Sequence, residues 1–218
     1  SVSFNLTADL PINNWGTGGA DGIAYSFGDD ANYTNPGGVV NGKGSKLRVS
    51  FDAAGNSTEN GNVSGIYVVY GWTATNAFGP GSTQTLAYSD NTSLWKTQTD
   101  VPVDVYVTVD GMLTLTVGGV VVFENIQLPQ DYADADKSTW KHLFSAGTGG
   151  DALRHAIDDL NITIGSYNYG IVSNGSPAPT TWQSTSVFNG LEIGVYDVWM
   201  SNPADETCSK MIGTYEIL

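Results

Sequence analysis

The sequence predicts an all-β fold, a sandwich or jelly roll of two antiparallel sheets followed by a small β module. Three observations predict it. Apolar and polar residues alternate in many short runs, which is typical of half-buried strands. Clusters of Gly, Asn, Asp and Pro bound these runs. The 218 residues include 27 glycines, which favour turns over long helices.

Nine alternating runs predict the strands of the first domain. They cover residues 22–27, 46–52, 64–70, 82–88, 101–110, 112–117, 120–125, 143–146 and 155–164. Asp110-Gly111 joins Val103–Val109 to Met112–Val117 and tolerates the positive φ angles of a type I′ turn, which predicts a tight hairpin. Only residues 129–137 indicate a helical turn. The first domain is therefore expected to span residues 1–164.

The texture of the chain changes at residue 165. Shorter runs follow, at residues 166–172, 186–188, 194–200 and 211–217, separated by loops rich in Pro, Ser and Asn. Four or five strands in so short a segment predict a small immunoglobulin-like β module over residues 165–218.

Charge and composition exclude several classes of partner. The formal net charge is −14, so nucleic acid would be repelled before a specific contact formed. No apolar run approaches the ~18 residues that a membrane-spanning helix needs. Cys208 is the single cysteine, which excludes an internal disulfide framework and favours a bacterial surface protein. We expect an extracellular or cell-surface segment of a longer multidomain chain.

Four segments occur in a characteristic order along the first domain. They are Gly19–Tyr25 (GADGIAY), the pair Gly37-Gly38, Leu47–Asp52 (LRVSFD) and Leu143–Gly150 (LFSAGTGG). Together they resemble the signatures of legume-type (L-type) lectins. Each motif alone is weak, but four in register over much of the domain make the resemblance worth testing. It implies a concanavalin-like jelly-roll sandwich that binds carbohydrate.

A sugar presents vicinal hydroxyls, so a binding site needs a carboxylate acceptor, backbone N–H donors and an aromatic face. In the resembled family the Asp of the ADG motif accepts sugar hydroxyls, which corresponds to Asp21. The glycine loops present backbone N–H groups, and Trp72 is a candidate for stacking. The expected carbohydrate-binding residues are Asp21, Gly38, Trp72, Gly149, Gly150 and Asp151. The alternative for Asp21 is an ordinary turn residue before a strand.

The resemblance also implies a metal site in the loop after the LRVSFD segment. Calcium binds six to eight oxygens, which carboxylates and amides supply. The candidate ligands on this loop are Asp52, Asn56, Glu59 and Asn60. Ser50 stands where the family has a glutamate, and the metal-binding histidine has no counterpart near Ser64, which argues against a transition metal. Calcium is therefore the expected cofactor, and an ordinary polar hairpin loop is the alternative.

A pair of adjacent aspartates elsewhere in the first domain is another candidate for binding a cation. Asp158-Asp159 lies in a run that reads as a strand, where one side chain should face inward and need a cation or several donors.

The sequence gives no sign of catalysis. Glycoside hydrolases on related sandwiches need two carboxylates on one strand face. The five glutamates are scattered, at Glu59, Glu124, Glu192, Glu206 and Glu216. We therefore expect a non-catalytic module. The alternatives are a structural or protein-binding adhesin domain without sugar affinity, and a glycoside hydrolase.

The terminal segment resembles the short repeats of large surface adhesins from gliding bacteria. The resemblance rests on Tyr167–Tyr169, on Val187–Val198 with its Gly-Leu-x-x-Gly-x-Tyr string, and on Cys208. It implies a spacer without a ligand of its own and, for the whole chain, a role in cell adhesion. The residues from Met200 to Asp205 depart from the repeat pattern.

Overall fold

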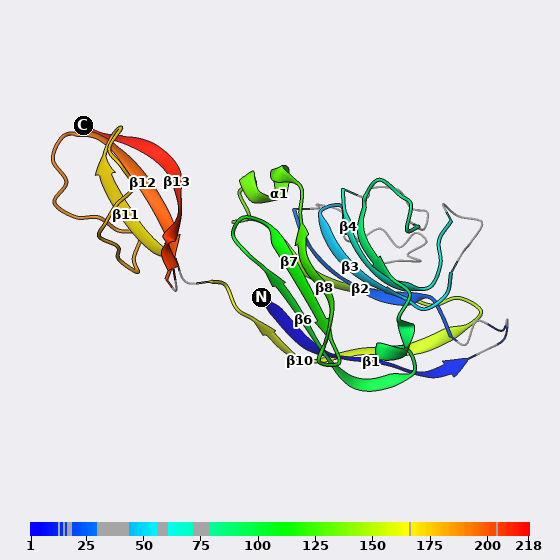
Figure 1. Ribbon diagram of the computed structural model, residues 1–218. Helices are drawn as coiled ribbons and strands as arrows, with labels where there is room; N and C mark the ends of the chain where they lie inside the picture. The colour runs from blue at the N-terminus through cyan, green and yellow to red at the C-terminus, as the bar shows by residue number, and fades with distance from the viewer. Residues whose placement is uncertain are drawn as a thin grey trace. The chain divides into compact units, whose positions relative to one another are not determined.

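The computed structural model describes residues 1–12, 14, 16, 19–29, 44–55, 61–71, 79–165, 167–203 and 205–218 (Figure 1). The chain divides into two compact units, Ser1–Ile162 and Thr163–Leu218. The division predicted after residue 164 falls in the same stretch of chain. Among the described residues, no helix is long and apolar enough to cross a membrane.

The first unit contains two five-stranded antiparallel sheets, which confirms the all-β prediction. The first sheet, here called sheet A, has the order β10-β1-β6-β7-β8. Its strands are β1 (Val2–Ile12), β6 (Gln98–Val107), β7 (Met112–Val117), β8 (Val120–Gln127) and β10 (Ala152–Ile162). The second, sheet B, has the order β5-β4-β3-β2-β9. Its strands are β2 (Gly22–Gly28), β3 (Leu47–Asp52), β4 (Gly65–Tyr70), β5 (Thr85–Ser89) and β9 (Lys141–Gly147).

The two sheets share one hydrophobic core, which gives the first unit the character of a β-sandwich (Figure 1). Sheet A contributes buried side chains such as Leu6 and Leu115, and sheet B contributes Phe51 and Val68. Burial of these apolar side chains is the main force that holds the layers together. Short helical turns, η1 (Thr92–Leu94) and α1 (Gln130–Asp134), join the strands.

The sheets differ in how many of their faces are buried. Strand β6 of sheet A alternates between buried and exposed residues from Asp100 onward, so one of its faces meets solvent. In sheet B every residue of β3 and of β4 is buried. The second face of β3 carries Arg48, Ser50 and Asp52, so polar groups are buried there and must be compensated locally.

Strands occur at all nine predicted positions of the first unit. The hairpin between β6 and β7 is also confirmed, but its predicted turn type is wrong. Gly111 has a positive φ of 86°, whereas Asp110 has none, and a type I′ turn needs both. The turn with positive φ at both central residues is Gly118-Gly119, which joins β7 to β8.

Strand β1 was not among the predicted strands. Its sequence alternates apolar and polar residues from Val2 to Ala8, so the same signal would have found it, although Thr7 is buried along with its neighbours. It lies between β10 and β6 in sheet A.

The second unit is a three-stranded antiparallel sheet of order β11-β12-β13. The strands are β11 (Asn168–Ser173), β12 (Gly194–Asn202) and β13 (Asp205–Ile217). The strand predicted at 186–188 is wrong, because that segment is irregular. A buried carboxylate, Asp197 of β12, ties the unit together. It accepts hydrogen bonds from Asn174 Nδ2 at 2.9 Å, from the Gly175 N–H at 2.8 Å and from Thr214 Oγ1 at 2.6 Å.

Candidate functional site

Asp21 lies immediately before β2, at one end of sheet B. Three backbone hydrogen bonds fix the Ala20-Asp21 segment, whose peptide bond is cis. The Asp21 N–H donates to the Gly147 carbonyl at 2.9 Å, and the Ala53 N–H donates to the Asp21 carbonyl at 2.8 Å. The Leu153 N–H donates to the Ala20 carbonyl, also at 2.9 Å. The last residue of β9, the residue after β3 and the start of β10 therefore converge on this one segment.

The Asp21 side chain is half-buried and faces a glycine. A Cβ atom placed on Gly149 would lie 3.6 Å and 3.8 Å from the two carboxylate oxygens of Asp21, so the missing side chain leaves the carboxylate accessible. Burial raises the pKa of Asp21, and no hydrogen bond or neighbouring charge opposes that shift. Within the described part of the chain, no donor pairs with this carboxylate. A partly desolvated carboxylate without a donor keeps acceptor capacity that is not used inside the protein.

The loop after β9 is ordered by its own hydrogen bonds. The Gly149 N–H donates to the Asp151 carbonyl at 3.0 Å, and Asn14 Nδ2 donates to the Gly150 carbonyl at 2.7 Å. The N–H of Gly149 is thus engaged within the loop, and this glycine offers Asp21 open space instead of a donor. Sequence reasoning missed Asn14, because its partner lies 136 residues away.

Two carboxylates assigned to binding are completely buried. Asp151, predicted to contact sugar, and Asp52, predicted to bind calcium, each have 0% of their surface exposed. The oxygens of Asp52 already accept hydrogen bonds, Oδ1 from the Ala54 N–H at 3.0 Å and Oδ2 from Asn62 Nδ2 at 2.8 Å. The structure places the Asp151 side chain inside the protein, where a ligand at the surface does not reach it.

A lysine lies beside these two acids. Lys96 Nζ donates to the Ala53 carbonyl at 2.6 Å, and the charges of Asp52 and Asp151 both act on the ammonium. Burial lowers the pKa of Lys96, and the two carboxylates oppose that shift. Sequence reasoning missed Lys96, since 43 residues separate it from Ala53 along the chain.

The remaining predicted site residues lie outside the described residues. They are Gly38 and Trp72 of the sugar site and Asn56, Glu59 and Asn60 of the metal site. Within the described ranges, no group of three or more His, Cys, Asp or Glu side chains is placed to hold a metal ion. Of the four predicted calcium ligands, only Asp52 is therefore described, and both of its carboxylate oxygens accept hydrogen bonds from nitrogen donors.

The expectation that Asp158 or Asp159 faces inward is wrong, because both residues are exposed. The pairing of β10 with β1 shifts register opposite Ser3 and Asn5, and Asp159 has a positive φ of 50°. This irregularity breaks the strict alternation of sides and turns both carboxylates to solvent.

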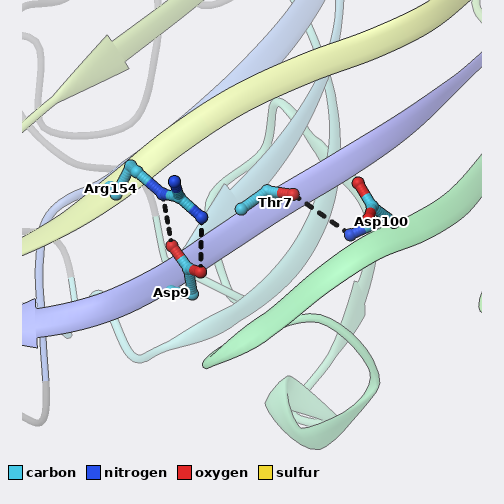
Figure 2. Close-up of polar contacts among 4 residues, drawn as sticks. All are labelled: Thr7, Asp9, Asp100 and Arg154. Carbon is cyan, nitrogen blue, oxygen red and sulfur yellow. Dashed lines mark hydrogen bonds and ion pairs between the residues drawn. The ribbon is translucent and has the colours of Figure 1, made fainter.

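The outer side of sheet A carries a second polar cluster. Unlike Asp21, the side chains of this cluster bind one another. Arg154 of β10 forms a bidentate ion pair with Asp9 of β1, at 2.7 Å and 2.6 Å (Figure 2). The Asp100 N–H donates to Thr7 Oγ1 at 3.0 Å (Figure 2). These contacts join adjacent strands of sheet A, and because Arg154 is exposed its ion pair contributes little to stability.

No protein-family model matches the chain, and no curated protein matches it.

Proposed function

We propose that the first unit is a non-catalytic carbohydrate-binding module of the lectin type, with Asp21 as its central acceptor. The observation that carries this proposal is the Asp21 carboxylate, which is half-buried, has no donor within the described residues and faces the open space beside Gly149. A carboxylate pays a desolvation cost in such a place, and a ligand with two hydroxyl donors would offset it.

The surroundings of Asp21 suit a sugar ring. Gly149 has no Cβ beside the Asp21 carboxylate, so a sugar ring can approach the main chain there. The Gly150 N–H donates no hydrogen bond within the described residues, so it is available to a sugar oxygen. Because the three backbone hydrogen bonds at Ala20-Asp21 hold the acceptor in place, little conformational entropy is lost on binding.

The charge of the protein restricts the class of glycan. A net charge of −14 repels uronic acids and sulfated sugars, and an unpaired carboxylate at the centre of the site repels them further. The proposed ligand is therefore a neutral glycan or polysaccharide.

The wider proposal concerns the parent protein. The concanavalin-like jelly roll follows from the lectin resemblance, and the immunoglobulin-like character of the second unit follows from its predicted strand content. Both belong to this proposal. A lectin module followed by a spacer is suited to an extracellular bacterial adhesin, in which weak single sites gain avidity through repetition.

A glycan array with the wild-type chain and Asp21→Asn tests the proposal. We expect the wild type to bind neutral glycans. The amide keeps the shape of the side chain but loses its charge and one acceptor site, and we expect affinity to fall by roughly tenfold or more, since hydrogen bonds to charged groups contribute about 1.5–3 kcal/mol. The melting temperature should not fall.

The matched control is Asp104→Asn, an exposed aspartate of β6 whose loss changes the net charge equally. It should leave binding unchanged. A wild type that binds no glycan would support the structural adhesin domain instead. Cleavage of an oligosaccharide would support the hydrolase.

A further inference from the structure

We propose that the ammonium of Lys96 is the resident cation at this end of sheet B, in the role that the sequence resemblance gives to calcium, and that it positions Asp21.

The two buried acids need positive charge. Asp52 and Asp151 have no exposed surface, and burying an ionised carboxylate is costly unless donors or a cation compensate it. Asp52 has two hydrogen-bond donors, and the charges of both acids act on Lys96. The charge of Lys96 thus interacts with two carboxylates, one at the end of β3 and one immediately before β10.

The contact with Ala53 links this cation to the proposed binding residue. The Ala53 carbonyl accepts from Lys96 Nζ at 2.6 Å and from Ser64 Oγ at 3.2 Å. On its other side, the Ala53 N–H donates to the Asp21 carbonyl at 2.8 Å. A single residue therefore separates the ammonium from the main chain of Asp21, and a shift of Ala53 would move the acceptor.

The donor set favours an ammonium over calcium. Calcium takes six to eight oxygens at about 2.3–2.6 Å, and each carboxylate oxygen of Asp52 is already directed at a nitrogen donor. An ammonium needs only a few acceptors, and the Ala53 carbonyl supplies one in direct hydrogen-bond geometry. Lys96 is covalently held, so the site keeps its charge without a metal in solution.

The first test measures the melting temperature of the wild-type chain in EDTA and in calcium chloride at constant ionic strength. We expect no change in either, since a metal that binds only the native state would raise stability by mass action. Saturable stabilisation by calcium, or destabilisation by EDTA, would overturn the proposal whatever the variants do.

The second test uses Lys96→Met, which keeps the apolar stem and removes the charge, and Lys96→Ala, which leaves room for a small cation. We expect the melting temperature to fall by several degrees in both. Methylammonium should restore part of the loss in Lys96→Ala, whereas tetramethylammonium, which cannot donate a hydrogen bond, should not. Lys141→Met is the control, because Lys141 is exposed and should tolerate the change.

Unchanged melting of Lys96→Met, or equal effects of the two ammonium salts, would contradict the cation role. Where Lys96→Met fails to fold, Lys96→Arg keeps a cation, and failure of that variant to retain more stability than Lys96→Ala would contradict it also.

The positioning role rests on the proposed function, whereas the cation role does not. At temperatures well below its melting temperature, where the variant is folded, Lys96→Met should bind glycan more weakly than the wild type. It should also shift the amide resonances of Ala53 and Asp21. An unshifted Asp21 amide would refute positioning. Loss of stability with no glycan binding in the wild type would refute the lectin proposal alone.

Discussion

Asp21 in the first unit and Asp197 in the second are aspartates in opposite surroundings. Asp197 is buried and accepts three hydrogen bonds, and these donors lower its pKa. Asp21 is half-buried and has no donor among the described residues, and burial raises its pKa. The first arrangement holds strands and a loop together, and the second leaves acceptor capacity for a ligand. Burial alone therefore does not decide the pKa of an acid, because Asp197 has donors and a lowered pKa whereas Asp21 has a raised one.

The largest expected effect separates the two acids by stability. Asp197→Ala removes the acceptor of Asn174, Gly175 and Thr214, so the second unit should melt several degrees lower. Asp21→Ala should leave both units as stable as in the wild type. Hydrogen exchange read by mass spectrometry resolves the units. Equal losses of protection in the two variants would remove the distinction.

The next effect is on how stability depends on pH, because the contributions of Asp197 and Asp21 to the free energy of unfolding change with pH in opposite directions. The lowered pKa of Asp197 gives stability that is present above its unfolded value of 3.8 and is lost as pH falls through the folded pKa. The raised pKa of Asp21 gives stability below 3.8 that is lost as pH rises through the folded pKa. Acid should therefore weaken the second unit in a way that Asp197→Asn removes. Urea unfolding of both proteins at pH 7 and pH 3 measures this, and parallel losses would contradict it.

A smaller effect is expected from filling the open space beside Asp21, which the proposed glycan site needs as much as the charge. In Gly149→Ala the new methyl group would make ordinary contact with the Asp21 carboxylate, so the fold should persist. Partial cover of the acceptor should weaken glycan binding by about 3- to 10-fold, the worth of one hydrogen bond. Gly81→Ala is the control, since a Cβ there meets nothing within 4 Å. Calorimetry that finds the two variants equal would argue against a ligand at Gly149.

The smallest effect is expected on the outer face of sheet A, where Arg154 lowers the pKa of Asp9. Arg154→Ala should shift the melting temperature only slightly, because an exposed ion pair is screened by water and salt. The difference from wild type should shrink further in 1 M salt, where the Debye length is about 3 Å. A large, salt-independent loss would show that this cluster supports the fold more than its exposure implies.

Much of the fold could be predicted because alternation is a local property. Residues 112–117 alternate apolar and polar side chains, and β7 has those same bounds. Turn chemistry was less certain, because Asp-Gly permits several turns and only the pairing of β6 with β7 selects one. The inward acid expected at Asp158-Asp159 failed for a related reason, since a register shift is invisible in an alternating pattern.

The sequence by itself determined the acidic charge and most of the strand positions, with β1 missed and one strand misplaced. Only the tertiary structure decided that Asp151 is buried, that Asn14 orders the loop and that Lys96 lies against Ala53. The physical reason is the distance along the chain over which each interaction acts. Strand periodicity depends on neighbouring residues, whereas the compensation of a buried charge depends on groups that the sheets bring together from distant parts of the chain.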